Sequence, residues 1–197
     1  PQAYAQLVQT IIPDSKGWLH LKSQLTNLST EALCLNEVAS LESEKPGQTV
    51  FGKEQERARV YEDGGYWGRA RPLSRPVAST AERAEQAPGG ESIGTSQICW
   101  EIYNLADRMA LLVGYTTFER WLGTVKTRYT PPIGIAEWLV GFDAGDLLVD
   151  PGQTLPLEAV VLMLGRDPWH LLEEFGDLVK EKRNIKPLPK APVSWCS

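Results

Sequence analysis

The pattern of hydrophobic and polar positions predicts strands along most of the chain. Residues 18–25 alternate, with leucines on one face and mainly polar side chains on the other, as a half-buried strand requires. The polar residues 27–30 predict a turn, and apolar alternation resumes over 33–38, so we expect the two segments to form a hairpin. The other predicted strands cover 57–61, 98–103, 109–118, 125–129, 136–140, 147–149 and 155–164.

The spacing of these strands and turns predicts a sandwich of antiparallel sheets. The continuous apolar run over 109–113 suits a strand that is buried on both faces. Residues 150–153, with the letters DPGQ, predict a tight turn. Residues 74–90 are rich in Pro, Ala, Glu, Arg and Gly and predict a long loop.

One amphipathic helix is predicted near the end of the chain, over 168–183. Asp167 suits the N-cap and Pro168 the first helical position. The expected apolar face consists of Trp169, Leu172, Phe175 and Val179, with Leu171 and Leu178 beside them. Acidic residues early in the segment and basic residues late in it match the helix dipole.

Composition narrows the classes of protein that remain. The 197 residues are 42% hydrophobic, and 20 Lys and Arg against 25 Asp and Glu give a net charge of −5. No window approaches the roughly 18 apolar residues of a membrane helix. An acidic balance argues against nucleic acid or an anionic membrane as partner. We therefore expect no nucleic-acid and no membrane partner, no signal peptide, and a cytoplasmic location.

Few residues suggest metal or cofactor chemistry. The three cysteines, Cys34, Cys99 and Cys196, lack zinc-ligand spacing and predict reduced thiols. Residues 89–96 resemble a phosphate-binding loop but carry Thr95 in place of its lysine, and they precede a strand rather than a helix. Asp143, Asp146 and Asp150 do not match the spacing of an EF-hand and predict turns. We expect no metal and no cofactor.

The aromatic residues suggest one candidate sugar contact. The chain has seven tryptophans, and indole rings both stack on sugars and fill sandwich cores. Trp100 and Trp138 lie in strand patterns and are expected in the core. The candidate contact is an aromatic platform with a carboxylate and a guanidinium after a double glycine: Asp63, Tyr66, Trp67 and Arg69. No catalytic group is assigned, since His20 and His170 lie in unpromising contexts.

Four segments, taken in chain order, resemble glycoside hydrolase family 36, the α-galactosidases and raffinose synthases. Residues 111–121 read LLVGYTTFERW and are similar to the family's LLVGF-TxxRW stretch. Residues 148–155 read LVDPGQTL and look like its L-x-PGE-x-L turn. Residues 165–168, GRDP, and the helix after them resemble the segment that leads to the family's barrel. Residues 192–197, PVSWCS, look like the start of P-x-x-WCSWY, the first barrel strand.

The resemblance implies a mainly all-β chain, an antiparallel β-supersandwich of galactose mutarotase-like fold, with one C-terminal α-helix leading towards a (β/α)8 barrel. The sandwich domain would span 1–185, including helix 168–183, and 186–197 would be a linker and the start of the barrel. We therefore expect this sequence to be a piece of a longer protein. In the family, two barrel aspartates cleave α-galactosides with retention. They would lie beyond residue 197, so no catalytic residue is carried over to this chain.

The resemblance also implies partners. The domain would pack on its own C-terminal barrel, meet α-galactoside-type sugars through that barrel, lend a loop to the rim of the substrate pocket, and contribute to a homo-oligomer. Residues 63–69 would be that loop. Residues 74–90 depart from the family pattern, which leaves open the substrate and whether the parent protein is an active hydrolase.

Three other functions stay open. A stand-alone carbohydrate-binding module would bind sugars and lose that affinity in Trp67→Ala. A structural or oligomerisation domain would expose an apolar patch where its partner docks. A mutarotase-like enzyme would need histidine acid/base chemistry, for which His20 and His170 are poorly placed in the sequence.

Overall fold

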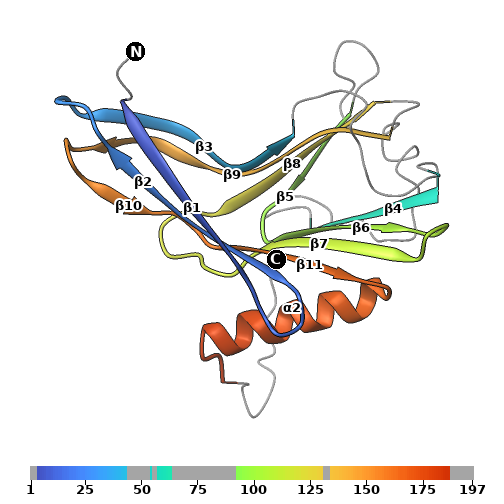
Figure 1. The fold of residues 1–197 in the computed structure, drawn as a ribbon. Helices are drawn as coiled ribbons and strands as arrows, with labels where there is room; N and C mark the ends of the chain where they lie inside the picture. Colours follow the sequence, from blue (N-terminus) through green and yellow to red (C-terminus); the bar gives the residue numbers. More distant parts are fainter. Residues whose placement is uncertain (1–3, 44–53, 55–56, 64–91, 131–133, 187–197) are drawn as a thin grey trace, which may run out of the picture.

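Two antiparallel sheets face each other, and one helix packs against the outer side of the larger sheet (Figure 1). The computed structural model describes residues 4–43, 54, 57–63, 92–130 and 134–186. These residues are mainly β, with antiparallel sheets and one helix at their C-terminal end, which confirms the predicted fold class. None of the helical residues among them form a segment long and apolar enough to cross a membrane.

The larger sheet has seven strands in the order β1-β2-β11-β7-β6-β4, with β10 also paired to β2. Its strands are β1 Ala5–Pro13, β2 Leu19–Asn27, β4 Ala58–Glu62, β6 Cys99–Asn104, β7 Met109–Tyr115, β10 Thr154–Pro156 and β11 Val160–Gly165. The smaller sheet has four strands in the order β3-β9-β8-β5. They are β3 Leu33–Ser43, β5 Ser92–Ser96, β8 Gly123–Thr130 and β9 Gly134–Val149.

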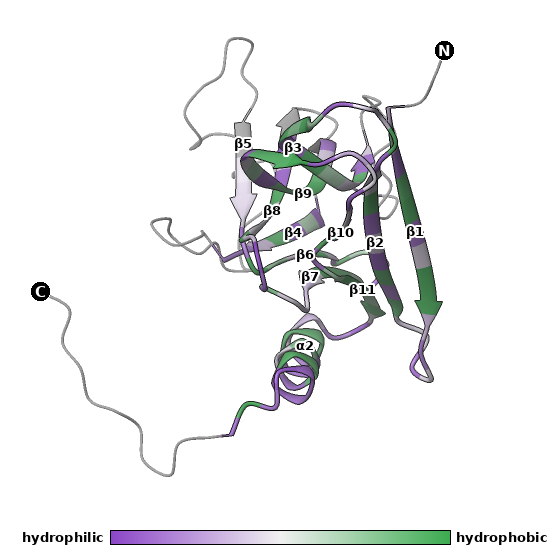
Figure 2. Ribbon diagram, turned by 90° about the vertical axis from the view of Figure 1, so that its left-hand side faces the viewer, coloured by the Kyte–Doolittle hydropathy of each residue, from purple (hydrophilic) through white to green (hydrophobic). Residues whose placement is uncertain are grey.

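Apolar side chains fill two layers, one between the sheets and one under the helix. Figure 2 gives the hydropathy of each residue along the ribbon. Alternation along β6 and β7 supplies both layers, because successive side chains of a strand point to opposite faces. Trp100 and Val113 enter the layer between the sheets, whereas Cys99 and Leu112 enter the layer under the helix. Residues 110–113 are thus covered on both faces, as predicted, whereas Met109 at the start of the run is 44% exposed. Trp100 is 3% exposed and stacks on the half-buried Trp138, with ring centroids 6.1 Å apart.

The helix is α2, Pro168–Lys182, and it begins as the sequence predicts. The Asp167 side chain accepts hydrogen bonds from the backbone N–H groups of Trp169 and His170, which satisfies two donors of the first turn. The helix lies very close to β7 at Gly114, where a Cβ atom would come within 2.4 Å of the Phe175 ring. Only glycine therefore permits this approach.

The predicted hairpin between 18–25 and 33–38 is wrong. β2 and β3 belong to different sheets, and β3 pairs with β9. The reason lies at the end of β2, where the buried Asn27 side chain donates to the backbone oxygens of Glu31 and Val149, each at 2.8 Å. These bonds fasten the connection to the smaller sheet and carry the chain across the sandwich.

Two strand boundaries also differ from the prediction. Residues 136–140 and 147–149 are parts of one 16-residue strand, β9. The intervening Gly145 and Asp146 adopt positive φ angles of 61° and 59°, and the ladder with β3 shifts register nearby, so the glycines and aspartates form a bulge rather than a break. In the reverse case, the segment 155–164 divides into β10 and β11, because Pro156 cannot donate to a ladder.

The sequence pattern gave no prediction for residues 5–13, which form β1. This strand pairs with β2 along its whole length. Its apolar residues come in adjacent pairs rather than in alternation, so the period-2 signal of a strand is missing.

Candidate functional site

Asp63, the first residue of the candidate sugar contact, lies at the end of β4. Its carboxylate accepts hydrogen bonds from the backbone N–H groups of Gln97, Ile98 and Cys99, and its own N–H donates to Ser96 Oγ. Asp63 therefore fastens the corner between β5 and β6. The other three residues of the candidate contact, Tyr66, Trp67 and Arg69, and the loop predicted over 74–90 lie outside the described residues.

A cleft that the sequence did not suggest lies where the β6–β7 turn meets the start of α2. Its lining consists of Arg57, Tyr103, Leu105, Arg108, Arg166, Asp167, Pro168 and Trp169. Arg57 forms an ion pair with Glu54 at 3.4 Å. The combination of exposed guanidinium groups with Tyr and Trp rings suits a polar ligand that has a flat face.

Trp169 was predicted on the apolar face of the helix, and that prediction is wrong. Its side chain is 59% exposed, whereas Leu171 and Phe175 are buried. Trp169 lies six residues before Phe175. At about 100° per residue, its side chain points about 120° away from that of Phe175 around the helix axis, so Trp169 lies outside the buried face. An apolar face drawn through Leu171 and Phe175, which are four residues apart, leaves Trp169 outside it and would have predicted its exposure.

The carboxylate of Glu158 accepts four hydrogen bonds. Its Oε1 accepts from the backbone N–H groups of Glu119, Arg120 and Trp121 at 3.0, 2.8 and 3.2 Å, and its Oε2 accepts from Thr117 Oγ1. Burial alone would raise the pKa of Glu158, but these hydrogen bonds outweigh it and hold the pKa below its ordinary value. The carboxylate is therefore charged and fully occupied by the protein.

This carboxylate organises one of the segments that carry the family resemblance. The loop 117–121 is the TFERW part of that segment, and it folds around Glu158. Trp121 then stacks on Phe142 of β9, with ring centroids 4.4 Å apart. The motif thus acts as a joint between the larger and the smaller sheet.

Glu101 of β6 is the opposite case. Its side chain is fully buried, and neither carboxyl oxygen has a hydrogen-bond partner. Burial, with a smaller contribution from the charge of Asp167, raises the pKa of Glu101 to about 8. A raised carboxyl pKa is a property of general acids, but this group lies beneath α2 and has no surface through which it could reach a substrate.

Cys99 is the neighbour of Glu101 on the same face of β6. Burial, followed by the charges of Asp63 and Glu101, raises the pKa of the Cys99 thiol to about 12. Both cysteines in the described part of the chain, Cys34 and Cys99, are free, and Cys196 lies outside it. A buried thiol with such a high pKa is not a nucleophile.

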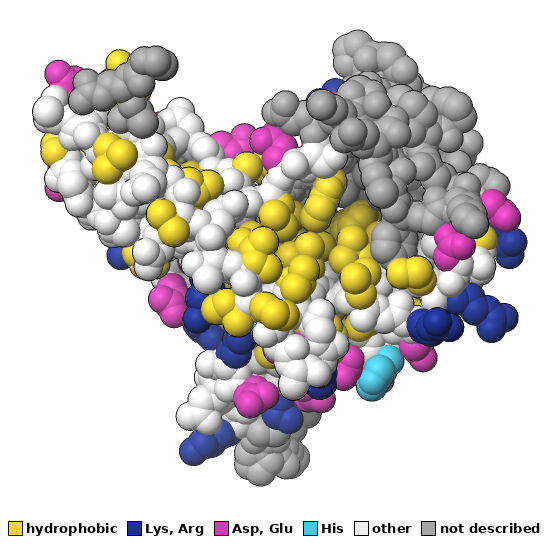
Figure 3. Space-filling view, viewed as in Figure 1, with side chains coloured by type: hydrophobic (Ala, Val, Ile, Leu, Met, Phe, Trp, Pro, Cys, Tyr) yellow, Lys and Arg dark blue, Asp and Glu magenta, His cyan; other side chains and the backbone are white. Residues whose placement is uncertain are grey.

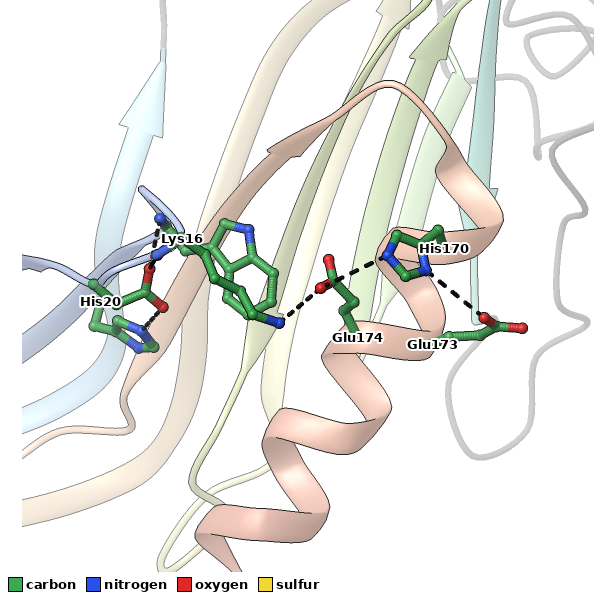
Figure 4. A network of polar contacts seen from close by, with 7 residues as sticks. Lys16, His20, His170, Glu173 and Glu174 are labelled. Atoms are coloured by element: carbon green, nitrogen blue, oxygen red, sulfur yellow. Dashed lines mark hydrogen bonds and ion pairs between the residues drawn. The ribbon is translucent and has the colours of Figure 1, made fainter.

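The histidines belong to a polar network that ties the β1–β2 turn to the helix (Figure 4). His20 Nε2 lies 3.0 Å from Asp14 Oδ2, and its other ring nitrogen lies 3.4 Å from Lys182 Nζ. A His–Asp pair serves catalysis when the second ring nitrogen of the histidine faces a nucleophile. Here the second ring nitrogen of His20 faces the ammonium group of Lys182 on α2. The pair therefore has a structural role.

The second part of this network is on the surface. Lys16 Nζ lies 2.7 Å from Glu174 Oε1 and stands over the Trp18 ring, 4.2 Å from its centroid. His170 extends from the first turn of α2 towards Glu173 and Glu174. It is a surface residue, as the sequence suggested.

Of the aspartates considered for calcium, Asp143 and Asp146 lie inside β9 at its bulge, so the turn prediction is wrong for these two, whereas Asp150 begins a turn as predicted. Asp143 Oδ1 accepts from the backbone N–H of Gly145 at 2.8 Å, and the backbone oxygen of Asp150 accepts from the N–H of Gln153 at 3.0 Å. Across the described ranges, no cluster of three or more His, Cys, Asp or Glu side chains could hold a metal ion.

Comparison with known proteins finds a likeness among solved structures but none among family models or curated sequences. No family model matches the chain, and no curated protein sequence matches it. Among solved structures, it is similar to the α-galactosidase from Lactobacillus brevis, with 13% sequence identity and a TM-score of 0.48. The match covers 91% of this chain and 29% of that enzyme, so the chain spans less than a third of the enzyme's length.

Proposed function

We propose that this chain is the non-catalytic β-sandwich domain of an α-galactosidase-like glycoside hydrolase, and that it supports a (β/α)8 barrel carrying the catalytic aspartates. The observation that carries the proposal is the chain order of the four family-36-like segments. The architecture is compatible with it, since two facing antiparallel sheets precede one helix in the order that the resemblance implies.

The chemistry of the described carboxyl groups supports a structural rather than a catalytic role. Asp63 and Glu158 are saturated by backbone hydrogen bonds, and Glu101 is sealed beneath the helix. A retaining glycosidase needs two carboxyl groups about 5 Å apart that face the same open cleft. None of these three groups meets that requirement, so the proposal assigns hydrolysis to a barrel after residue 197.

The same proposal gives the domain its partners. Residues 1–185 form the sandwich domain with its helix, and 186–197 lead into the barrel. Tyr66, Trp67 and Arg69 would then contribute to the rim of a pocket for α-galactoside-type sugars. In a longer protein that hydrolyses such sugars, Trp67→Ala should raise KM more than it lowers kcat, while the surface variant His170→Ala should leave both unchanged.

The direct test is hydrolysis of an aryl α-galactoside by two purified proteins, the 197-residue chain and the longer product of its gene. The longer protein should release the aryl alcohol and the 197-residue chain should not. Hydrolysis that follows the concentration of the purified 197-residue chain through successive columns would falsify the assignment of chemistry to the barrel.

The cleft at the start of α2 favours a second candidate, a carbohydrate-binding module. Trp169 is exposed there beside Tyr103 and two arginines, Arg108 and Arg166. This candidate requires heat of binding when galactosides, melibiose or raffinose are titrated into the 197-residue chain. The heat should disappear in Trp169→Ala and persist in Leu148→Ala, which removes an exposed apolar side chain on β9 of the smaller sheet. No heat with the wild-type chain excludes this candidate.

A further inference from the structure

The most unusual surface among the described residues is the free edge of β1. This strand is the last of the larger sheet, because β2 is its one neighbour in the strand order. Figure 2 shows β1 as the outermost strand of the sheet. In an antiparallel sheet, every second residue of an edge strand directs its N–H and C=O groups away from its neighbour, so β1 offers a row of backbone groups along nine residues.

The side chains of this edge are apolar on both faces. Leu7 and Ile11 lie opposite Leu25 and Leu21 of β2 and point to the side of the smaller sheet, yet they are 42% and 60% exposed. Val8 and Ile12, on the other face, are 46% and 43% exposed. Figure 3 shows this face of the molecule, on which the largest group of apolar side chains lies between the two sheets, to the right of β1.

The strand also lacks the features that normally keep edges apart. Natural proteins guard exposed edges with charged residues, bulges or short strands. Of the other edge strands described, β3 carries Glu37 and Glu42, β4 carries Arg59 and Glu62, and β5 has five residues without large apolar groups apart from Ile93. β1 has no charged residue, no register shift in its ladder, and a proline only at its last position.

We propose that β1 is a self-association edge, on which a second copy of this chain adds its own β1 in antiparallel orientation. The incoming strand must be neutral, apolar on both faces and free along one edge. Among the described strands, β1 itself is the one that combines these properties. Two identical antiparallel strands that pair are related by a two-fold axis. Each copy then covers the free edge of the other, so association stops at the dimer.

The sequence of β1 is self-complementary about Gln9. A two-fold axis through Gln9 places Leu7 of one copy opposite Ile11 of the other on the inner face, and Val8 opposite Thr10 on the outer face. No charged side chain meets another along the strand. The Gln9 side chain points towards the smaller sheet, where it donates to the backbone oxygen of Ser40 on β3.

Residues next to β1 would enlarge the contact. Tyr4, directly before the strand, is 70% exposed, and Leu19, at the start of β2, is 38% exposed. In the proposed register, Tyr4 of one copy comes to the β1–β2 turn of the other, where Asp14 and Lys16 lie. The inference is independent of the proposed function, because it rests on the strand edge alone.

The first experiment measures the mass of the 197-residue chain by light scattering after size exclusion, over a range of concentrations. The expected mass at high concentration is twice the 21.9 kDa of one chain. Ile11→Lys should weaken the dimer at least about tenfold, because it places two charges in an apolar seam. Leu148→Lys is the matched control, since Leu148 on β9 is 63% exposed and far from β1 in the strand order.

The second experiment tests the register and does not depend on the folding of Ile11→Lys. Opposite residues of paired strands have Cβ atoms about 4.5–5.5 Å apart, within reach of a disulfide after small adjustment. Gln9→Cys, in a background with Cys34→Ser and Cys196→Ser, should therefore form a cross-linked dimer on mild oxidation. Gln24→Cys, on β2 of the same sheet but away from the edge, should stay monomeric under the same conditions.

Several results would overturn the proposal. They are a wild-type chain that stays monomeric up to about 100 µM, a dimer that survives Ile11→Lys without a Gln9→Cys cross-link, and open-ended assemblies in place of a dimer. A longer gene product that is monomeric but protects the β1 amide protons from exchange would assign the edge to another part of the same protein.

Discussion

Glu158 and Glu101 are both buried in the sandwich, yet their surroundings shift their pKa values in opposite directions. Glu158 receives four hydrogen bonds from the loop 117–121, and its pKa is lowered. Glu101 receives none, and its pKa rises to about 8. The comparison teaches that the supply of donors, not the depth of burial, decides whether a buried carboxyl group holds the structure together or weakens it.

The largest expected effect is that of removing the donor-saturated carboxylate. Glu158→Ala leaves the Thr117 hydroxyl and three backbone N–H groups without their acceptor, which should lower the free energy of unfolding by about 4 kcal/mol. Urea denaturation measures this loss. The control is Glu119→Ala, because Glu119 is exposed in the same loop and should change stability by less than about 0.5 kcal/mol.

The lowered pKa of Glu158 also sets the range of pH over which this carboxylate stabilises the fold. The unfolded carboxyl group titrates near its ordinary value of 4.5 and the folded one below it. The stabilisation is therefore complete above pH 4.5 and is lost as the pH falls through the folded pKa. An acid unfolding curve of Glu158→Ala that runs parallel to the wild-type curve would break the comparison.

Glu101→Gln should give the next largest effect, with the opposite dependence on pH. The folded pKa of about 8 lies above the ordinary value of 4.5, so the folded protein keeps a proton that the unfolded chain loses. Wild-type stability should fall as the pH rises from 4.5 and level off above about 8. Glutamine does not titrate, so the variant should gain about 2 kcal/mol over the wild type between pH 4 and pH 9.

Denaturation at several pH values measures that gain. Glu173→Gln, a substitution on the exposed side of α2, serves as the control and should give a flat difference. A flat difference for Glu101→Gln as well would mean that the Glu101 carboxyl group is hydrated or paired, and the contrast with Glu158 would disappear.

Asp63 sharpens the comparison as an intermediate case. Asp63→Asn keeps one acceptor oxygen but turns an amide N–H₂ towards the backbone donors of 97–99, and the expected loss of stability is about 1.5 kcal/mol. Thermal unfolding detects a change of this size. If Asp63→Asn unfolds at the wild-type temperature, the carboxylate does not hold the β5–β6 corner.

The smallest effect is expected from the surface pair between the β1–β2 turn and α2. Lys16→Ala breaks the contact with Glu174. The Lys16 side chain is 55% exposed in this pair. Exposed pairs contribute about 0.5 kcal/mol and less at high salt. If the free energy of unfolding falls by more than about 1 kcal/mol and the loss persists in 1 M salt, this exposed pair contributes as much as a buried carboxylate and the comparison fails.

The sequence predicted the parts of the fold that depend on neighbours along the chain. The strand 18–25, the helix after Asp167 and the core position of Trp100 all follow from local periodicity or capping. Glu101 alternates with Trp100 and Ile102 and therefore has the pattern of a solvent-facing residue. Only the packing of α2 across β6 buries it, and that contact joins distant parts of the chain.

The same limit applies to the candidate site and to the sheet connections. Nothing local to Glu158 indicates that its carboxylate meets a loop 37 to 41 residues earlier. The crossing from β2 to β3 depends on Asn27 and the distant Val149, so a turn-like sequence was interpreted as a hairpin. Asp63 was a candidate for the sugar contact, but its carboxylate accepts hydrogen bonds from the backbone N–H groups of residues 97–99. No pattern of residues in the sequence indicates these bonds.

The most direct measurement of the central claim is the coding sequence that follows Ser197 in the source gene. We expect Trp and Tyr codons next, and then several hundred residues of alternating strands and helices with aspartates at strand ends, as a supporting domain of an α-galactosidase-like hydrolase requires. A stop codon directly after Ser197 would contradict the account, because the chain would then have no catalytic barrel to support.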